Sequence, residues 1–169
     1  KPTFTSVLSV ALLGAAKAYA SMGDNLVHVS ERTGITVEAL SELSFAADLR
    51  GVEAEAFESG IRKMQKTIVS AAKGSAEVQE ALGMLGVTIK DLDGLSPDEQ
   101  FKLIADRLAQ IEDPTIRAAM AMQIFGKNGT ALLPMISAGA DGLDALCKQA
   151  RALGLTISTE DAEAAHGFS

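Results

Sequence analysis

Residues 53–73 read EAEAFESGIRKMQKTIVSAAK, and this stretch decides the fold class. Its apolar residues recur at steps of four, three, four and four, at Phe57, Ile61, Met64, Ile68 and Ala72. That spacing places them on one face of an α-helix. Acidic residues come early in the stretch and lysines come late, as the helix dipole favours. The stretch therefore predicts an amphipathic helix.

Helix N-cap signals predict further short helices after residue 73. Ser96 precedes Pro97 and is followed three residues later by Glu99, the sequence of a capping box with proline at the first helical position. Asp113 precedes a proline in the same way. The patterns predict helices at residues 76–85, 97–110, 114–125 and 141–152 and another from about residue 159. No pair of strands is predicted.

Glycines mark the joints between these helices. The form Gly-apolar-Thr-apolar occurs three times and starts at Gly34, Gly86 and Gly154. Glycine accepts the left-handed conformation that closes a helix, and the apolar residue after it can pack back on the last turn. The copies are 52 and 68 residues apart, so they are not a repeat of fixed period.

The first part of the chain carries a longer apolar pattern. Seven residues follow one another at steps of four and three: Leu8, Leu12, Ala15, Tyr19, Met22, Leu26 and Val29, which we call the seam. A repeat of 3.5 residues is typical of a coiled coil, and it also fits an amphipathic helix that packs on the following domain. We predict an all-α chain: a leading helix (1–33), then a module (34–169) of about seven short helices in a compact orthogonal array with glycine-capped joints.

Composition and charge limit the classes of function. The chain is 47% hydrophobic but only 4% aromatic, which suits packed helices. A net charge of −7 opposes binding to nucleic acid or to an anionic membrane, since both need a basic patch. The single cysteine, Cys147, cannot form an internal disulfide. We expect the chain to be a segment of a longer protein made in a reducing compartment.

The beginning of the chain also resembles a secretory signal. Lys1 is followed by an apolar run, Val7 to Ala16, and by small residues around Tyr19. However, Lys17 lies where such signals are uncharged, and the run is shorter than the ~18 residues that a membrane-spanning helix needs. An ordinary helix within a larger chain is therefore predicted, with a signal or membrane element as the alternative.

Residues 125–136, FGKNGTALLPMI, raise the question of a phosphate-binding loop. Such a loop needs a first glycine where Ala121 stands and a hydroxyl where Asn128 stands, between a strand and a helix. The segment instead fits a joint, in which Gly126 ends one helix and Asn128-Gly129 makes a turn. Asn128 or Thr130 would cap the next helix, which begins near residue 133 or bends at its proline.

No catalytic, metal or cofactor site is predicted elsewhere. Asp91 and Asp93 are too few for a calcium loop, and Cys147 lies on the apolar face of its helix without a base beside it. No other histidine or cysteine stands at metal-binding spacing from His28, and His166 stands near the end of the sequence, so neither is predicted to bind a metal. The carboxylates fall on exposed faces and at helix starts, where solvation and dipoles alone would place them.

Taken in order, residues 16–169 resemble the phage tail tape measure protein family, especially its prophage members. The matching stretches include GITVEALSELSFAA (34–47), GVEAEAFESGIRKMQKTIVSAA (51–72), LGVTIKDLDG (85–94), SPDEQFKLIADRL (96–108), AAMAMQIFGKNGTALL (118–133) and ALGLTIST (152–159). The clearest mark is an FGK-x-G-x-x-LLP pattern after a helix rich in alanine and methionine. The family more often has a small residue where Asn128 and Thr130 stand.

The resemblance implies a structural virion protein of the phage tail. Such chains are long and largely helical, fill the tail tube, set its length during assembly in the host cytoplasm, and leave ahead of the DNA. It implies self-association and contacts with tube, tail-tip and chaperone proteins, with no cofactor, no enzymatic activity and no specific nucleic acid. The alternatives are a membrane-active or cell-wall-penetrating segment of the same kind of protein, and a peptidoglycan-degrading enzyme.

Overall fold

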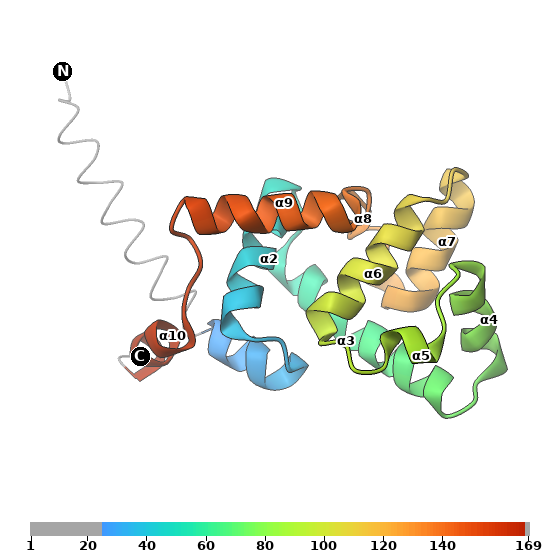
Figure 1. Cartoon of the computed structure of the whole chain (residues 1–169), viewed down its shortest axis with the longest axis horizontal. Coiled ribbons are helices and arrows are strands. Elements are labelled where there is room, and N and C mark those ends of the chain that lie inside the picture. Colours follow the sequence, from blue (N-terminus) through green and yellow to red (C-terminus); the bar gives the residue numbers. More distant parts are fainter. Residues whose placement is uncertain (1–24, 168–169) are drawn as a thin grey trace, which may run out of the picture.

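The computed structural model describes residues 25–167, which are helical with short links and contain no strand. The all-α prediction is confirmed within this range. The helices are residues 25–33, α2 (Val37–Leu49), α3 (Ala54–Ala72), α4 (Ala76–Met84), α5 (Ile89–Leu92), α6 (Pro97–Ala109), α7 (Pro114–Phe125), α8 (Leu133–Ile136), α9 (Gly139–Ala152) and α10 (Thr159–Gly167), with a 3-10 turn η1 (Gly126–Asn128) after α7 (Figure 1).

Two helices organise the packing. α3 contacts α4, α6, α7 and η1, while α9 packs against α2 and α6 and runs along one side of the molecule (Figure 1). α5 also contacts α3, and α10 returns to α2 from the far end of the sequence. The helices on both sides of α6 thus meet in one cluster of buried side chains.

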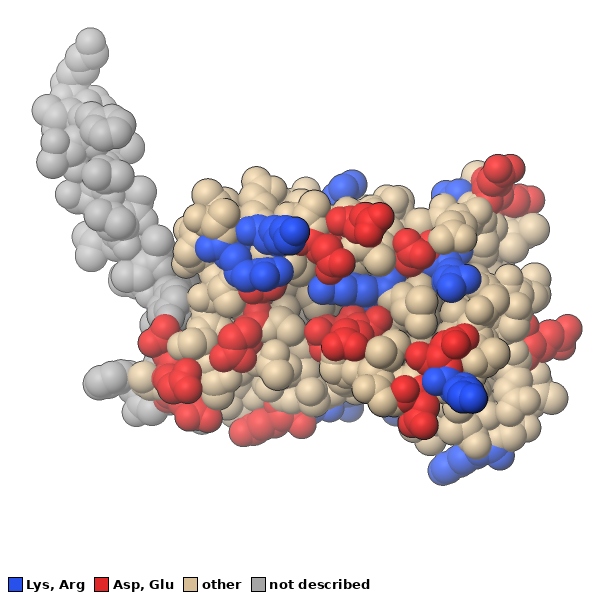
Figure 2. All heavy atoms as spheres, in the orientation of Figure 1, with Lys and Arg blue, Asp and Glu red and all other residues tan. Residues whose placement is uncertain are grey.

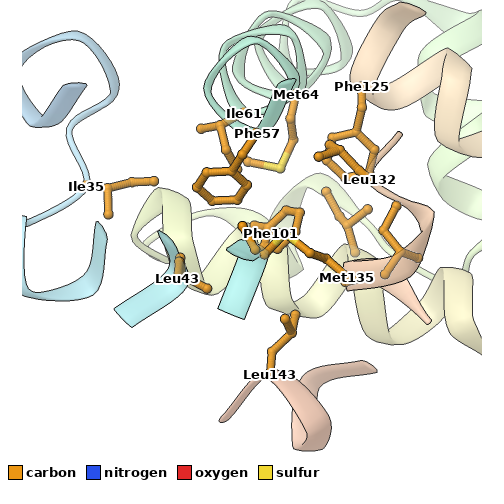
Figure 3. Close-up of a cluster of buried hydrophobic side chains, with 14 of the residues drawn as sticks. Ile35, Leu43, Phe57, Ile61, Met64, Phe101, Phe125, Leu132, Met135 and Leu143 are labelled. Carbon is orange, nitrogen blue, oxygen red and sulfur yellow. The ribbon is translucent and has the colours of Figure 1, made fainter. Parts of the chain in front are cut away.

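Phe101 lies at the centre of this cluster (Figure 3). Its ring meets the ring of Phe57 edge-on, with centroids 5.4 Å apart, and meets that of Phe125 at 5.8 Å. Edge-to-face contacts of this kind add attraction beyond the burial of apolar area. Phe101 is fully buried. One residue of α6 therefore connects α3 with α7.

The buried face of α3 differs slightly from the predicted stripe. Phe57, Ile61 and Met64 are buried as expected, and Ile68 is partly buried against the core. Thr67 and Ala71 are also buried, whereas Ala72 is exposed. The Thr67 hydroxyl lies 2.9 Å from the Lys63 carbonyl oxygen and 3.0 Å from that of Ile124, so it can donate a hydrogen bond inside the core. A polar residue with such a partner can be buried at little cost.

Glycines end helices at the three Gly-apolar-Thr-apolar joints and after α7. Gly34, Gly86, Gly126 and Gly154 all have φ between 71° and 78°. At the second joint the amide of Gly86 donates to the carbonyl of Gly83 and that of Val87 to the carbonyl of Leu82, which is a Schellman motif. Val87 is buried, and the Thr88 hydroxyl accepts from the amide of Asp91 to start α5.

The third joint departs from the other two. Leu155 is 46% exposed, whereas Ile35 and Val87, at the same position of the motif, are buried. Thr156 does not cap the following helix but donates a hydrogen bond to Glu42 of α2 at 2.9 Å. The link after α9 is therefore tied to α2, and its leucine is left at the surface.

Candidate functional site

The end of the seam lies inside the folded molecule. Leu26 is 3% exposed and Val29 is 7% exposed, and both belong to the same core as α2 and α3. The other seam residues lie outside the described part of the chain: Leu8, Leu12, Ala15, Tyr19 and Met22. So does the apolar run of residues 7–16 on which membrane contact was considered.

Polar contacts also hold residues 25–33 in place. The Gln65 side chain donates to the carbonyl oxygen of Thr33 at 2.6 Å. The Arg32 guanidinium donates to the Glu58 carboxylate, also at 2.6 Å. Both partners are on α3, so the residues that precede Gly34 pack against the helices that follow it.

The joint at residues 125–136 is built by close approach of backbones. Gly126 has a φ of +76° and lies against the side chain of Lys63 on α3. Gly129 has ordinary right-handed angles, φ −56° and ψ −41°. A Cβ atom added there would lie 2.4 Å from the carbonyl oxygen of Ala121 in α7. Gly129 is therefore required for space rather than for a left-handed turn.

Asn128 does not have the predicted role of a cap. It lies in the 3-10 turn, and the chain continues in tight turns to Leu132, whose amide donates to the carbonyls of Asn128 and Gly129. α8 begins at Leu133 with no side-chain cap, because the amides of its first turn already donate to backbone carbonyls of the preceding turn. Pro134 stands in the first turn of α8, where proline is tolerated, and this confirms the helix start near residue 133.

The surroundings of Lys127 do not form a phosphate-binding loop. Lys127 is exposed, and its segment follows helix α7 where such a loop would follow a strand. Leu132, a few residues later, is fully buried against Gly60 of α3: a Cβ atom on Gly60 would lie 2.4 Å from its Cδ1 atom. The sequence had not indicated this contact. A glycine in the middle of a strongly amphipathic helix was the available signal.

The two predicted proline-linked caps differ. Asp113 accepts hydrogen bonds from the amides of Thr115 and Ile116 and so caps α7. Ser96 occupies the N-cap position of α6, but its side chain makes no cap hydrogen bond, so the predicted capping box is wrong. Glu99 at the third helical position is exposed, and water can satisfy the first-turn amides.

Three polar residues on one face of α2 hold the C-terminal link, and we call them the clasp: Glu38, Ser41 and Glu42. Ser41 accepts from the amide of Ile157 at 2.9 Å, and Glu42 accepts from Thr156. Glu38 accepts from the amide and the hydroxyl of Thr159 at 2.5 and 2.8 Å. The Thr159 hydrogen bond lowers the pKa of the Glu38 carboxyl. The clasp joins residues more than 110 positions apart, which no local pattern indicates.

An open apolar groove of about 850 Å³ lies beside the clasp. Its walls come from residues 25–26, the second half of α2, the start of α3 and the link after α9. The side chains that line it include Leu26, Phe45, Val52, Phe57, Leu155 and Ile157, with Asp48 and Glu53 also in the wall. Asp48 and Glu53 are the only titratable side chains among the described residues that line it.

Cys147 is not placed to act as a nucleophile. It is 2% exposed on the inner face of α9, and burial raises the pKa of its thiol. Lys102 lies near it and pairs with Asp144 at 2.8 Å. Burial alone would lower the pKa of Lys102, but the hydrogen bond with Asp144 and the charges of the neighbouring acidic groups together outweigh burial, so the pKa is raised. A protonated thiol in this setting packs as a small apolar group.

Within residues 25–167 no three histidine, cysteine or acidic side chains are grouped closely enough to hold a metal ion. None of the helices in this range combines the length and the apolar character that crossing a membrane requires. Asp91, considered above for calcium, instead accepts from the amide of Thr88 in a capping box, which lowers the pKa of its carboxyl.

Comparison with known proteins gave no relative. No protein-family model matches the chain, and neither a curated protein nor a solved structure matches it.

Proposed function

We propose that the chain is a segment of a phage tail tape measure protein, a structural component of the virion that takes part in tail assembly and tail-length determination. The observation that carries the proposal is the joint at residues 125–136. The residues that give the family resemblance there are the ones that pack: Gly126 against α3, Gly129 against α7 and Leu132 against Gly60. A packing role, rather than chemistry, accounts for each of them.

Within that protein the module acts in docking rather than as a ruler. A ruler needs a long helix, which rises ~1.5 Å per residue. Among the described helices the longest, α3, has 19 residues, and glycine joints return the chain on itself. We assign ruler character to the leading helix (1–33) with its seam. To residues 34–169 we assign an orthogonal array of about seven short helices that serves as a docking unit.

The partners that suit this role are other tail proteins and further copies of the chain. The candidates are the tube protein, the tail-tip proteins and the assembly chaperone, met in the host cytoplasm during assembly and retained in the virion. A net charge of −7 favours protein partners over nucleic acid. The role needs no cofactor and no catalytic residue.

Mass spectrometry of purified virions tests the proposal. Virions of the phage or prophage that encodes the chain are purified, and tails are separated from heads before digestion. We expect peptides from residues 34–169 in the tail fraction, at a level comparable with minor tail proteins. Their absence from tails that contain the other tail proteins would overturn the proposal.

A further inference from the structure

No segment of residues 25–167 fills the apolar groove. The part of the seam that precedes residue 25 is a candidate to bind there. Leu26, a seam residue, already lines the groove with only 3% of its surface exposed. Met22 and Tyr19 precede it by four and seven residues, so in a helix they share its face. At ~1.5 Å per residue they would lie roughly 6 and 10 Å further along the same direction.

The charges on the two sides are complementary. Residues 1–23 contain Lys1 and Lys17 and no acidic residue. The rest of the chain, residues 24–169, carries the other 13 basic side chains and all 22 acidic ones, which gives it a net charge of −9. Asp48 and Glu53 stand in the groove wall, and acidic side chains gather at the neighbouring end of the molecule, where α10 lies (Figure 2). Lys17 would therefore approach an acidic surface.

The covalent link favours a segment of the same chain over a separate partner. Asn25, the first described residue, is itself in the groove wall. A segment attached at that point has an effective concentration in the millimolar range, as short tethers give. Leu155, 46% exposed, offers apolar surface that such a segment would cover.

We propose that residues 15–22 of the chain bind in the groove of their own module, with Tyr19 and Met22 against Leu155 and Phe45 and with Lys17 towards Asp48 and Glu53. This extends the packing that Leu26 and Val29 begin. The binding concerns the isolated chain and holds whether or not the chain belongs to a phage tail.

Tyr19 provides the test, because it is the single tyrosine of a chain without tryptophan. Its fluorescence is quenched with acrylamide in the full chain, with N-acetyltyrosinamide as the fully exposed reference. The variant Leu155→Glu places a charge in the groove. The matched control Ile116→Glu makes the same change at a residue of α7 that is 44% exposed and outside the groove. Circular dichroism establishes that both variants are folded.

We expect Tyr19 to be protected from acrylamide in the wild type and in Ile116→Glu, at every protein concentration. In Leu155→Glu the protection is lost and quenching approaches the reference. The inference is overturned if wild-type Tyr19 is quenched as readily as the reference, or if folded Leu155→Glu keeps the protection. Protection that grows with protein concentration, together with a dimer in light scattering, would assign the groove to a second copy and overturn binding within one chain.

Discussion

Gly129 lies closer to a neighbouring helix than a side chain would allow. Its backbone angles are those of ordinary right-handed residues, so conformational freedom does not explain the glycine. The space does, because the atom nearest to an added Cβ is a backbone oxygen of α7, which cannot rotate away as a side chain can. At position 129 the joint therefore has room for the hydrogen atom of glycine but not for a methyl group.

We predict that Gly129→Ala lowers the free energy of unfolding by about 2–3 kcal/mol, the cost of overpacking a rigid contact. Gly83→Ala is the control, since no atom lies within 4 Å of a Cβ added there in α4. Alanine favours the helix, so this variant should gain about 0.5–1 kcal/mol. Urea unfolding followed by circular dichroism measures both. Equal effects of the two substitutions would contradict the account of Gly129.

Glu38 makes the stability depend on pH. Hydrogen bonds from Thr159 lower its folded pKa below the ordinary value of 4.5, so the folded carboxyl releases its proton more readily than the unfolded one. Its contribution is therefore present above about pH 4.5 and is lost as pH falls through the lower folded pKa.

We predict that Glu38→Gln lowers the free energy of unfolding at neutral pH by about 1 kcal/mol. The difference in free energy of unfolding between the variant and the wild type should become smaller in acid, where Glu38 of the wild type is protonated. Urea unfolding from neutral to acid pH measures this. Glu163→Gln, at an exposed position of α10, should follow the wild type throughout. A constant difference between Glu38→Gln and the wild type down to strong acid would contradict the role of the clasp.

At the scale of the helices, an N-cap residue contributes to stability only where its side chain accepts hydrogen bonds from amides of the first turn. Asp113 accepts two amides at the start of α7, whereas Ser96 accepts none at the start of α6. Both residues precede a proline, and from sequence they give the same signal.

Alanine substitution at these caps should separate them. We expect Asp113→Ala to cost about 1 kcal/mol, as the loss of an N-cap generally does. Ser96→Ala should change the stability by less than about 0.5 kcal/mol, since no cap hydrogen bond is removed. Thermal or urea unfolding of the two variants gives the comparison. A larger loss for Ser96→Ala than for Asp113→Ala would contradict the assigned hydrogen bonds.

The helices and their glycine joints follow from the sequence because their causes are local. The apolar spacing of α3, the proline after Asp113 and the glycine at residue 86 each act within a turn or two. The groove and the clasp depend on α2 meeting the link after α9, more than 110 residues away, and no local pattern encodes that contact. Thr67 was missed for a related reason: its partner, the Ile124 carbonyl, belongs to a distant helix.

For the whole molecule, a single core joins the end of the seam to the later helices. Leu26 and Val29 lie in the same buried cluster as Phe57 and Phe101. Residues 25–33 should therefore unfold together with the helices that follow them.

We predict that Leu26→Ala destabilises the whole described unit by about 2–4 kcal/mol, as the loss of a buried leucine does. Leu49→Ala, at a position 52% exposed, is the control and should cost less than about 1 kcal/mol. Urea unfolding with circular dichroism records one transition in each case. A second transition in Leu26→Ala, with the main midpoint unchanged, would show that residues 25–33 are not part of the core.

The central claim is that residues 34–169 are a docking module in a phage tail and not a length of ruler. Its most direct test is an in-frame deletion of residues 34–169 in the phage, with tail lengths measured by electron microscopy. We predict that tails fail to assemble, and that any tails formed have the wild-type length. Tails shortened in proportion to the deletion, at ~1.5 Å per residue removed, would contradict the claim.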